Sequence, residues 1–109
     1  MPGRLENKRV LVTQSDTYMG PAVVELFGKE DADLVADSSD LTVDGAVASL
    51  LDRVGQVDVL VANLALGPQP SPAPDQPDEQ WHALFDTMVH PLMQLVRGVL
   101  PAMIERKAG

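Results

Sequence analysis

Residues 55–63 read Gly-Gln-Val-Asp-Val-Leu-Val-Ala-Asn, and this stretch contains the clearest strand of the chain. Residues 57–62 are apolar apart from Asp58, and three of the six are the β-branched valine. Such a short, nearly continuous apolar run is typical of a strand that is buried on both faces of a parallel sheet. We therefore expect a buried strand over residues 57–62.

Two more short apolar runs precede this strand, at residues 9–13 and 34–36. Segments with helical periodicity separate the three runs. The first covers residues 20–30, with Pro21 at a position where a helix tolerates proline. The second is capped by Asp40 or Thr42 and ends at Gly55. Alternating strands and helices predict an α/β fold whose parallel sheet is joined by right-handed crossovers.

A proline-rich loop and a long helix follow the last strand. Residues 64–77 contain five prolines (positions 68, 70, 72, 74 and 77), which exclude a helix or a central strand there. Residues 78–107 form an amphipathic stretch in which we expect Pro91 and Pro101 to kink or interrupt the helix. We expect residues 1–109 to form a single domain that includes this loop.

Composition excludes several classes of function. The net charge of −8 argues against nucleic acid as a partner, because phosphate backbones would be repelled. The absence of cysteine excludes disulfides and zinc–thiolate sites, and two isolated histidines, His82 and His90, do not indicate a metal site. The apolar runs are too short to span a membrane, and no signal peptide is evident. A cytoplasmic protein is expected.

Several features occur in an order that resembles one family. A strand ending in Thr13 runs into a loop that closes on Gly20, and Asp37 ends the second strand. Residues 55–63 match the pattern G-x-[IV]-D-x-L-V-x-N, and residues 100–103 match L-P-x-M. Together these motifs resemble the short-chain dehydrogenases/reductases.

This resemblance implies a Rossmann-like, three-layer α/β/α fold with a parallel sheet. It further implies an oxidoreductase that uses NAD or NADP on a small-molecule substrate. Its members associate through the long helix, so the resemblance implies a homo-oligomer in which Leu92, Leu95 and Val99 contact a second copy.

The cofactor loop departs from the family pattern T-G-x-x-x-G-x-G. Gln14 and Tyr18 stand where the first two glycines are expected, and only Gly20 remains. Glycines allow peptide N–H groups to approach a pyrophosphate at a helix N-terminus, so their loss predicts weakened binding of NAD or NADP. The pattern T-x4-[FY]-x-G also resembles halohydrin dehalogenases, a branch without a nicotinamide cofactor. In that branch Tyr18 would wall a halide or nucleophile pocket.

Three further departures concern the rest of the chain. The segment between Gly20 and Asn63 is shorter than the family's by about one helix and one strand. Met88 stands where many members carry a catalytic asparagine. Tyr18 is the only tyrosine, so no Tyr-x-x-x-Lys is present. We therefore expect no catalytic residue here, and a partial domain that is truncated after the fourth-strand region and the following long helix, and is inactive by itself.

The candidate cofactor-binding residues lie at the expected carboxyl ends of the strands. Asp37 either accepts hydrogen bonds from an adenosine ribose, which favours NAD over NADP, or belongs to a solvated turn. Three interpretations remain open: an oxidoreductase, a protein similar to the dehalogenases, and a non-catalytic Rossmann-like subunit. The full candidate set is Thr13, Gln14, Tyr18, Gly20, Asp37 and Asn63.

Overall fold

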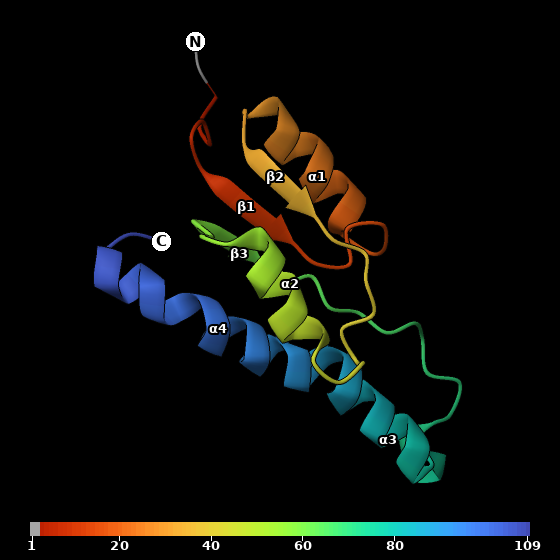
Figure 1. Ribbon diagram of the computed structural model, residues 1–109. Coiled ribbons are helices and arrows are strands. Elements are labelled where there is room, and N and C mark those ends of the chain that lie inside the picture. The colour runs from red at the N-terminus through yellow and green to blue at the C-terminus, as the bar shows by residue number, and fades with distance from the viewer. Residues whose placement is uncertain (1–2) are drawn as a thin grey trace.

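A parallel three-stranded sheet forms the centre of the computed structural model, which describes residues 3–109 (Figure 1). Its strands are β1 (Arg9–Val12), β2 (Asp33–Ala36) and β3 (Val59–Val61), in the order β2-β1-β3. Leu11 of β1 lies opposite Val35 of β2 and Leu60 of β3. Since β1 is central, its last three residues are fully buried. The predicted parallel sheet is confirmed.

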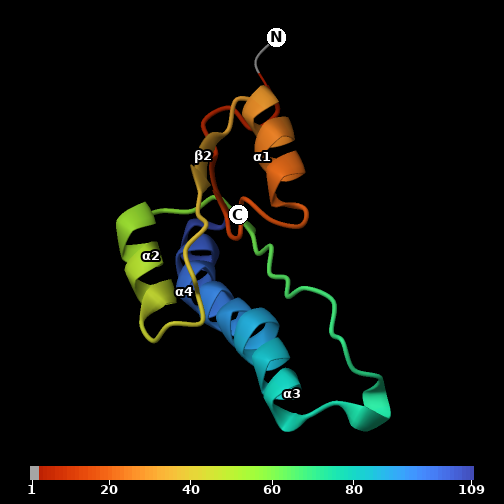
Figure 2. The same ribbon diagram turned by 90° about the vertical axis from the view of Figure 1, so that its right-hand side faces the viewer.

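Helices cover both faces of this sheet. α1 (Gly20–Lys29) joins β1 to β2, and α2 (Ala46–Val54) joins β2 to β3. Figure 2 shows α1 and α2 on opposite sides of β2, and the long C-terminal helix α4 (His90–Arg106) packs against α2. The three-layer α/β/α arrangement is thereby confirmed.

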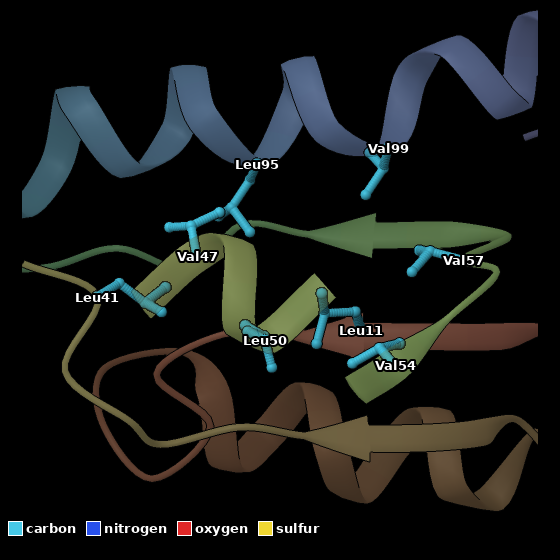
Figure 3. Close-up of a cluster of buried hydrophobic side chains, with 8 residues drawn as sticks. All are labelled: Leu11, Leu41, Val47, Leu50, Val54, Val57, Leu95 and Val99. Atoms are coloured by element: carbon cyan, nitrogen blue, oxygen red, sulfur yellow. The ribbon is translucent and has the colours of Figure 1, made fainter. Parts of the chain in front are cut away.

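The main core lies between the sheet and the pair α2 and α4 (Figure 3). Leu11 and Leu95 are fully buried there, and Val99 is 9% exposed. Leu95 and Val99 therefore pack inside the chain, so the expectation that they contact a second copy is wrong. Leu92 remains 43% exposed. The core cluster consists of Leu11, Leu41, Val47, Leu50, Val54, Val57, Leu95 and Val99.

α2 begins later than the sequence predicted. Asp40 accepts hydrogen bonds from the N–H (2.9 Å) and hydroxyl (2.6 Å) of Thr42, which forms a tight turn of its own instead of capping the helix. Gly45 then adopts a φ of 77°, and α2 starts at the next residue. Gly55 ends the helix as predicted.

The predicted long helix has three parts: α3 (Asp78–Leu84), a π-helical turn η2 (Phe85–Val89) and α4. Pro91 follows this turn and lies in the first turn of α4, where its missing N–H is tolerated. Pro101 lies inside α4 without ending it, so the expected interruption does not occur there. The proline-rich loop contains one short 3-10 turn, η1 (Ala73–Asp75). Within residues 3–109, no helix has the length and apolar character needed to cross a membrane.

β2 has a hydrogen-bonded neighbour on one side only among the described residues. Asp33 donates its N–H to Lys8, and Asp37 donates its N–H to Val12. Because alternate residues of a parallel strand bond to the same neighbour, the peptide groups of Leu34 and Ala36 point away from β1. This open edge agrees with the expected shortening of the segment between Gly20 and Asn63.

Candidate functional site

The carboxyl ends of β1 and β3 are tied together by two of the predicted site residues. Thr13 is fully buried and donates its N–H to Val61 (3.2 Å) and its hydroxyl to the carbonyl of Asn63 (2.9 Å). The amide of Asn63 donates in turn to the carbonyls of Gln14 (2.9 Å) and Thr17 (3.0 Å). Asn63 therefore fixes the loop between β1 and α1 from the strand beside it.

This loop keeps a glycine-like backbone where glycine is absent. Gln14 has a φ of 43° and Tyr18 a φ of 53°, in the left-handed region that L-residues avoid. Each such residue costs roughly 1–2 kcal/mol. The loop therefore bends at both positions as a glycine would allow, although both residues carry side chains.

The side chain of Gln14 spans from this loop to the segment after β3. Its amide nitrogen donates to the carbonyl of Ala65 (3.1 Å), and its amide oxygen accepts the N–H of Ala65. We call this pair of hydrogen bonds the Gln14 bridge. The prediction that a side chain replaces bare backbone here is consistent with the bridge, but the sequence did not identify its partner.

Gly20 and Tyr18 have opposite environments in the loop. A Cβ on Gly20 would lie 2.4 Å from the carbonyl oxygen of Gln14, so only glycine allows this close approach. Gly20 also donates its N–H to Thr17 (2.9 Å) and begins α1. Tyr18 is 76% exposed, so the described residues close no pocket over its ring.

Asp37 joins the site through its backbone. Its carbonyl accepts the N–H of Ser15 (3.0 Å). Its carboxylate instead accepts the N–H (3.2 Å) and hydroxyl (2.7 Å) of Ser39, and lies 4.0 Å from the guanidinium of Arg53. The carboxylate also lines a cavity other than the one beside Gln14. The structure therefore brings Thr13, Gln14 and Asn63 together, and the Asp37 carboxylate reaches the cavity beside Gln14 only through Ser39, which lines it.

A cavity of about 330 Å3 lies at the carboxyl edge of the sheet, beside the Gln14 bridge. Hydrogen bonds from the hydroxyl and N–H of Thr42 hold the pKa of Asp40, a lining residue, below its usual value. The wall is therefore acidic and rich in hydroxyl groups, which suits an uncharged, hydrogen-bonding ligand part better than a phosphate. The lining residues are Gln14, Ser39, Asp40, Leu41, Thr42, Leu64, Ala65, Leu66 and Thr87.

Ala65, Asp40 and Thr87 also line the cavity, and the sequence did not predict them as site residues. Ala65 takes part through its peptide groups, which carry no side-chain signal. Thr87 lies in the π-helical turn one residue before Met88, and such turns are frequent at functional sites. A larger open depression of about 860 Å3 lies at the opposite edge of the sheet, near Arg9 and Asp58. Ligands of open α/β sheets bind at the carboxyl ends of the strands, so the smaller cavity is the better candidate.

The backbone of the loop between β1 and α1 has a shape that suits a nicotinamide dinucleotide. The backbone is left-handed at Gln14 and Tyr18, and Gly20 packs closely against the loop. α1 therefore begins directly at the end of this loop, at Gly20. Helix N-termini favour phosphate groups. The side chains of Gln14 and Tyr18 add bulk to this shape without changing it.

Comparison with known proteins agrees with this geometry. The family model described as short chain dehydrogenase matches residues 6–109. The chain is 29% identical to the bovine (Bos taurus) dehydrogenase/reductase SDR family member 4, over 96% of this chain and 48% of that protein. It is 37% identical to serine 3-dehydrogenase of Rhizobium radiobacter, over 57% of this chain and 25% of that enzyme.

Solved structures give the same result. A short chain dehydrogenase/reductase family protein superposes with a TM-score of 0.86 and 28% identity, over 96% of this chain and 53% of that one. The chain thus spans about half the length of the relatives that it matches almost throughout. The alignment with the bovine protein extends over 133 positions, more than the 109 residues of the chain, so it contains gaps. The chain belongs to the short-chain dehydrogenase family.

Proposed function

We propose that the protein is an oxidoreductase of this family that binds NAD or NADP weakly and acts on a small-molecule substrate. The observation that carries the proposal is the loop between β1 and α1. It bends in the left-handed region at Gln14 and Tyr18, the two positions where the family pattern has glycine, and Gly20 packs against it too closely for any side chain. This backbone shape supports the proposal that the loop binds a nucleotide.

Each candidate site residue has a distinct role in the proposal. Thr13 and Asn63 hold the loop to β3, and Gly20 lets α1 begin against it. Gly20 donates its N–H to Thr17 and Pro21 has none, so the N–H of Ala22 and the loop before α1 orient the pyrophosphate. When bound, the nicotinamide dinucleotide supplies or accepts the hydride. Tyr18 is the only tyrosine of the chain, and the proposal assigns the movement of the substrate proton to no residue among 1–109.

Asp37 is proposed to set the choice between the two dinucleotides. Its carboxylate accepts two hydrogen bonds from Ser39, so a ribose hydroxyl must share or replace that contact. A carboxylate at this place repels the additional phosphate of NADP. We therefore expect NAD to bind more tightly than NADP, and Asp37→Ala to reduce the difference.

The experiment is a calorimetric titration of the complete gene product with NAD+, NADH, NADP+ and NADPH. We expect dissociation constants near the millimolar range, with NAD(H) tighter than NADP(H). An absence of binding for all four nucleotides at several millimolar would overturn the proposal.

A second assay on the same preparation tests the resemblance of the Tyr18 loop to halohydrin dehalogenases. Release of halide from a vicinal halohydrin, without any dinucleotide bound, would replace the oxidoreductase by a dehalogenase. The exposure of Tyr18 does not favour this outcome, because the ring walls no pocket of the described chain.

We also propose that the protein assembles with itself through α4. A second apolar stripe runs along this helix, with residues spaced by four that are more exposed than Leu95 and Val99 of the core. Its members are between 39% and 66% exposed: Leu92, Val96, Leu100 and Ile104. We call this set the α4 stripe. Burial of such a stripe against the same helix of a second copy would form a two-fold interface.

A further inference from the structure

The Gln14 bridge occupies a particular place between two parts of the candidate site. Gln14 and Ala65 both line the cavity of about 330 Å3. Among residues 14–20, Gln14 is the only one that lines it. The rest of the loop leads away from the cavity to Gly20, where α1 begins. Gln14 therefore adjoins both the cavity, which it lines, and the start of α1, where its carbonyl lies against Gly20.

The bridge is also held firmly in place. Gln14 is bound through its side chain to both peptide groups of Ala65, and through its own carbonyl to the amide of Asn63 at 2.9 Å. Because these hydrogen bonds hold the residue, moving the Gln14 side chain requires breaking them as well as changing its rotamer. A long ligand that reaches from the cavity to the start of α1 would pass Gln14.

We propose that Gln14 is a gate residue, whose amide blocks the passage between this cavity and α1 until a dinucleotide displaces it from Ala65. The inference rests on the proposed function, since it names what limits the affinity of that site. Displacement breaks two hydrogen bonds to peptide groups, and this loss appears as weaker binding. The side chain, and not the bend of the loop, is then the reason for a high dissociation constant.

Two substitutions separate the side chain from the backbone. Gln14→Asn keeps a residue that tolerates a positive φ, but its amide is one methylene too short to reach Ala65. Gln14→Gly removes the side chain and suits the φ of 43°. The matched control is Gln56→Asn, which makes the same chemical change at the opposite edge of the sheet.

Two measurements on the complete gene product test the gate. In calorimetric titration we expect NAD+ to bind both Gln14 variants about tenfold more tightly than wild type. The variants lack the bridge, so binding no longer has to break hydrogen bonds worth a net of roughly 1.4 kcal/mol. Gln56→Asn should bind as wild type does. In hydrogen exchange without ligand, the N–H of Ala65 should exchange about tenfold faster in Gln14→Asn, because the bridge protects it.

The outcomes separate the gate from the proposed function. Equal affinities in wild type and variants, with binding in both, would overturn the gate and leave the function standing. Unchanged exchange at Ala65 would show that the bridge does not form, which also overturns the gate. Faster exchange at Ala65 with no dinucleotide bound by any variant would reject the proposed function and, with it, the role of Gln14 as a gate.

Discussion

At the scale of single residues, Gly20 is the position where the loop tolerates least change. In Gly20→Ala, the new Cβ would meet the carbonyl oxygen of Gln14 at 2.4 Å and the backbone of Ser15 at 2.7 Å. Both neighbours are backbone atoms, so the loop itself must move. We expect a loss of about 1–3 kcal/mol in the free energy of unfolding, measured by urea denaturation.

Gly67→Ala is the control, because a Cβ at Gly67 meets nothing within 4 Å. We expect it to change stability by less than about 0.5 kcal/mol. A Gly20→Ala variant as stable as this control would mean that the loop does not pack as described.

Residues differ in how far the sequence predicts their roles. The positions of Thr13, Gly20 and Asn63 were predictable, because a strand end, a helix start and a polar residue after a buried strand are local patterns, whereas their binding of a cofactor stays a prediction. The partner of Gln14 was not, since the bridge joins its side chain to peptide groups 51 residues away and depends on a left-handed backbone. Asp37 was predicted by position, but its carboxylate faces Ser39 because a short turn offers nearer donors.

At the scale of elements, Asp58 joins the start of β1 to β3 and the end of α4. Its carboxylate accepts the N–H of Arg9 at 2.8 Å and lies 3.6 Å from the guanidinium of Arg106. The hydrogen bond from Arg9, with smaller contributions that include the charge of Arg106, lowers the pKa of Asp58 below its usual value.

A carboxyl group whose pKa is lower in the folded state stabilises the fold above its unfolded pKa of about 4, and this contribution disappears as the pH falls through the folded pKa. We expect Asp58→Asn to lose about 1 kcal/mol of unfolding free energy at pH 7. The difference from wild type should shrink below about pH 4. Urea denaturation from pH 7 to pH 2.5 measures both effects.

Asp52→Asn provides the matched control, since it removes the same charge from an exposed position of α2. Its effect on stability should be small at every pH. A constant difference between wild type and Asp58→Asn across the pH range would contradict the assigned role of the carboxylate.

The elements themselves were largely predictable, for reasons that also explain the errors. The strands follow from short valine-rich runs, and Gly55 ends α2 where the pattern indicated. The start of α2 was wrong because Asp40 and Thr42 bond to each other, and Gly45 then takes a conformation outside the helical region. Local side-chain competition of this kind leaves no trace in hydrophobic periodicity.

At the scale of the whole molecule, the described chain is less compact than its length suggests. Its radius of gyration is 15.6 Å and its long axis 53 Å, against about 13 Å expected for the radius of gyration of a compact domain of 100 residues. Figure 2 shows the cause, since α3 and the proline-rich loop extend beyond the sheet. Many apolar side chains of α3, η2 and α4 therefore face solvent.

The α4 stripe gives this exposure a measurable consequence. We expect Leu92→Glu combined with Val96→Glu to shift the complete gene product toward monomer in sedimentation velocity, because two buried carboxylates would oppose the interface. Gln94→Glu adds a charge to the same helix outside the stripe, and should leave the association unchanged. Association that is equal in all three proteins would exclude the α4 stripe as the interface.

The open side of β2 affects how the protein behaves in concentrated solution. The outward peptide groups of Leu34 and Ala36 offer a ready template on which another extended segment can add by backbone pairing. Two features limit this tendency: the strand has only four residues, and Asp33 places a charge at one end of it. A substitution such as Asp33→Val would remove that protection, so aggregates of such a variant should grow from this edge before any other part of the sheet.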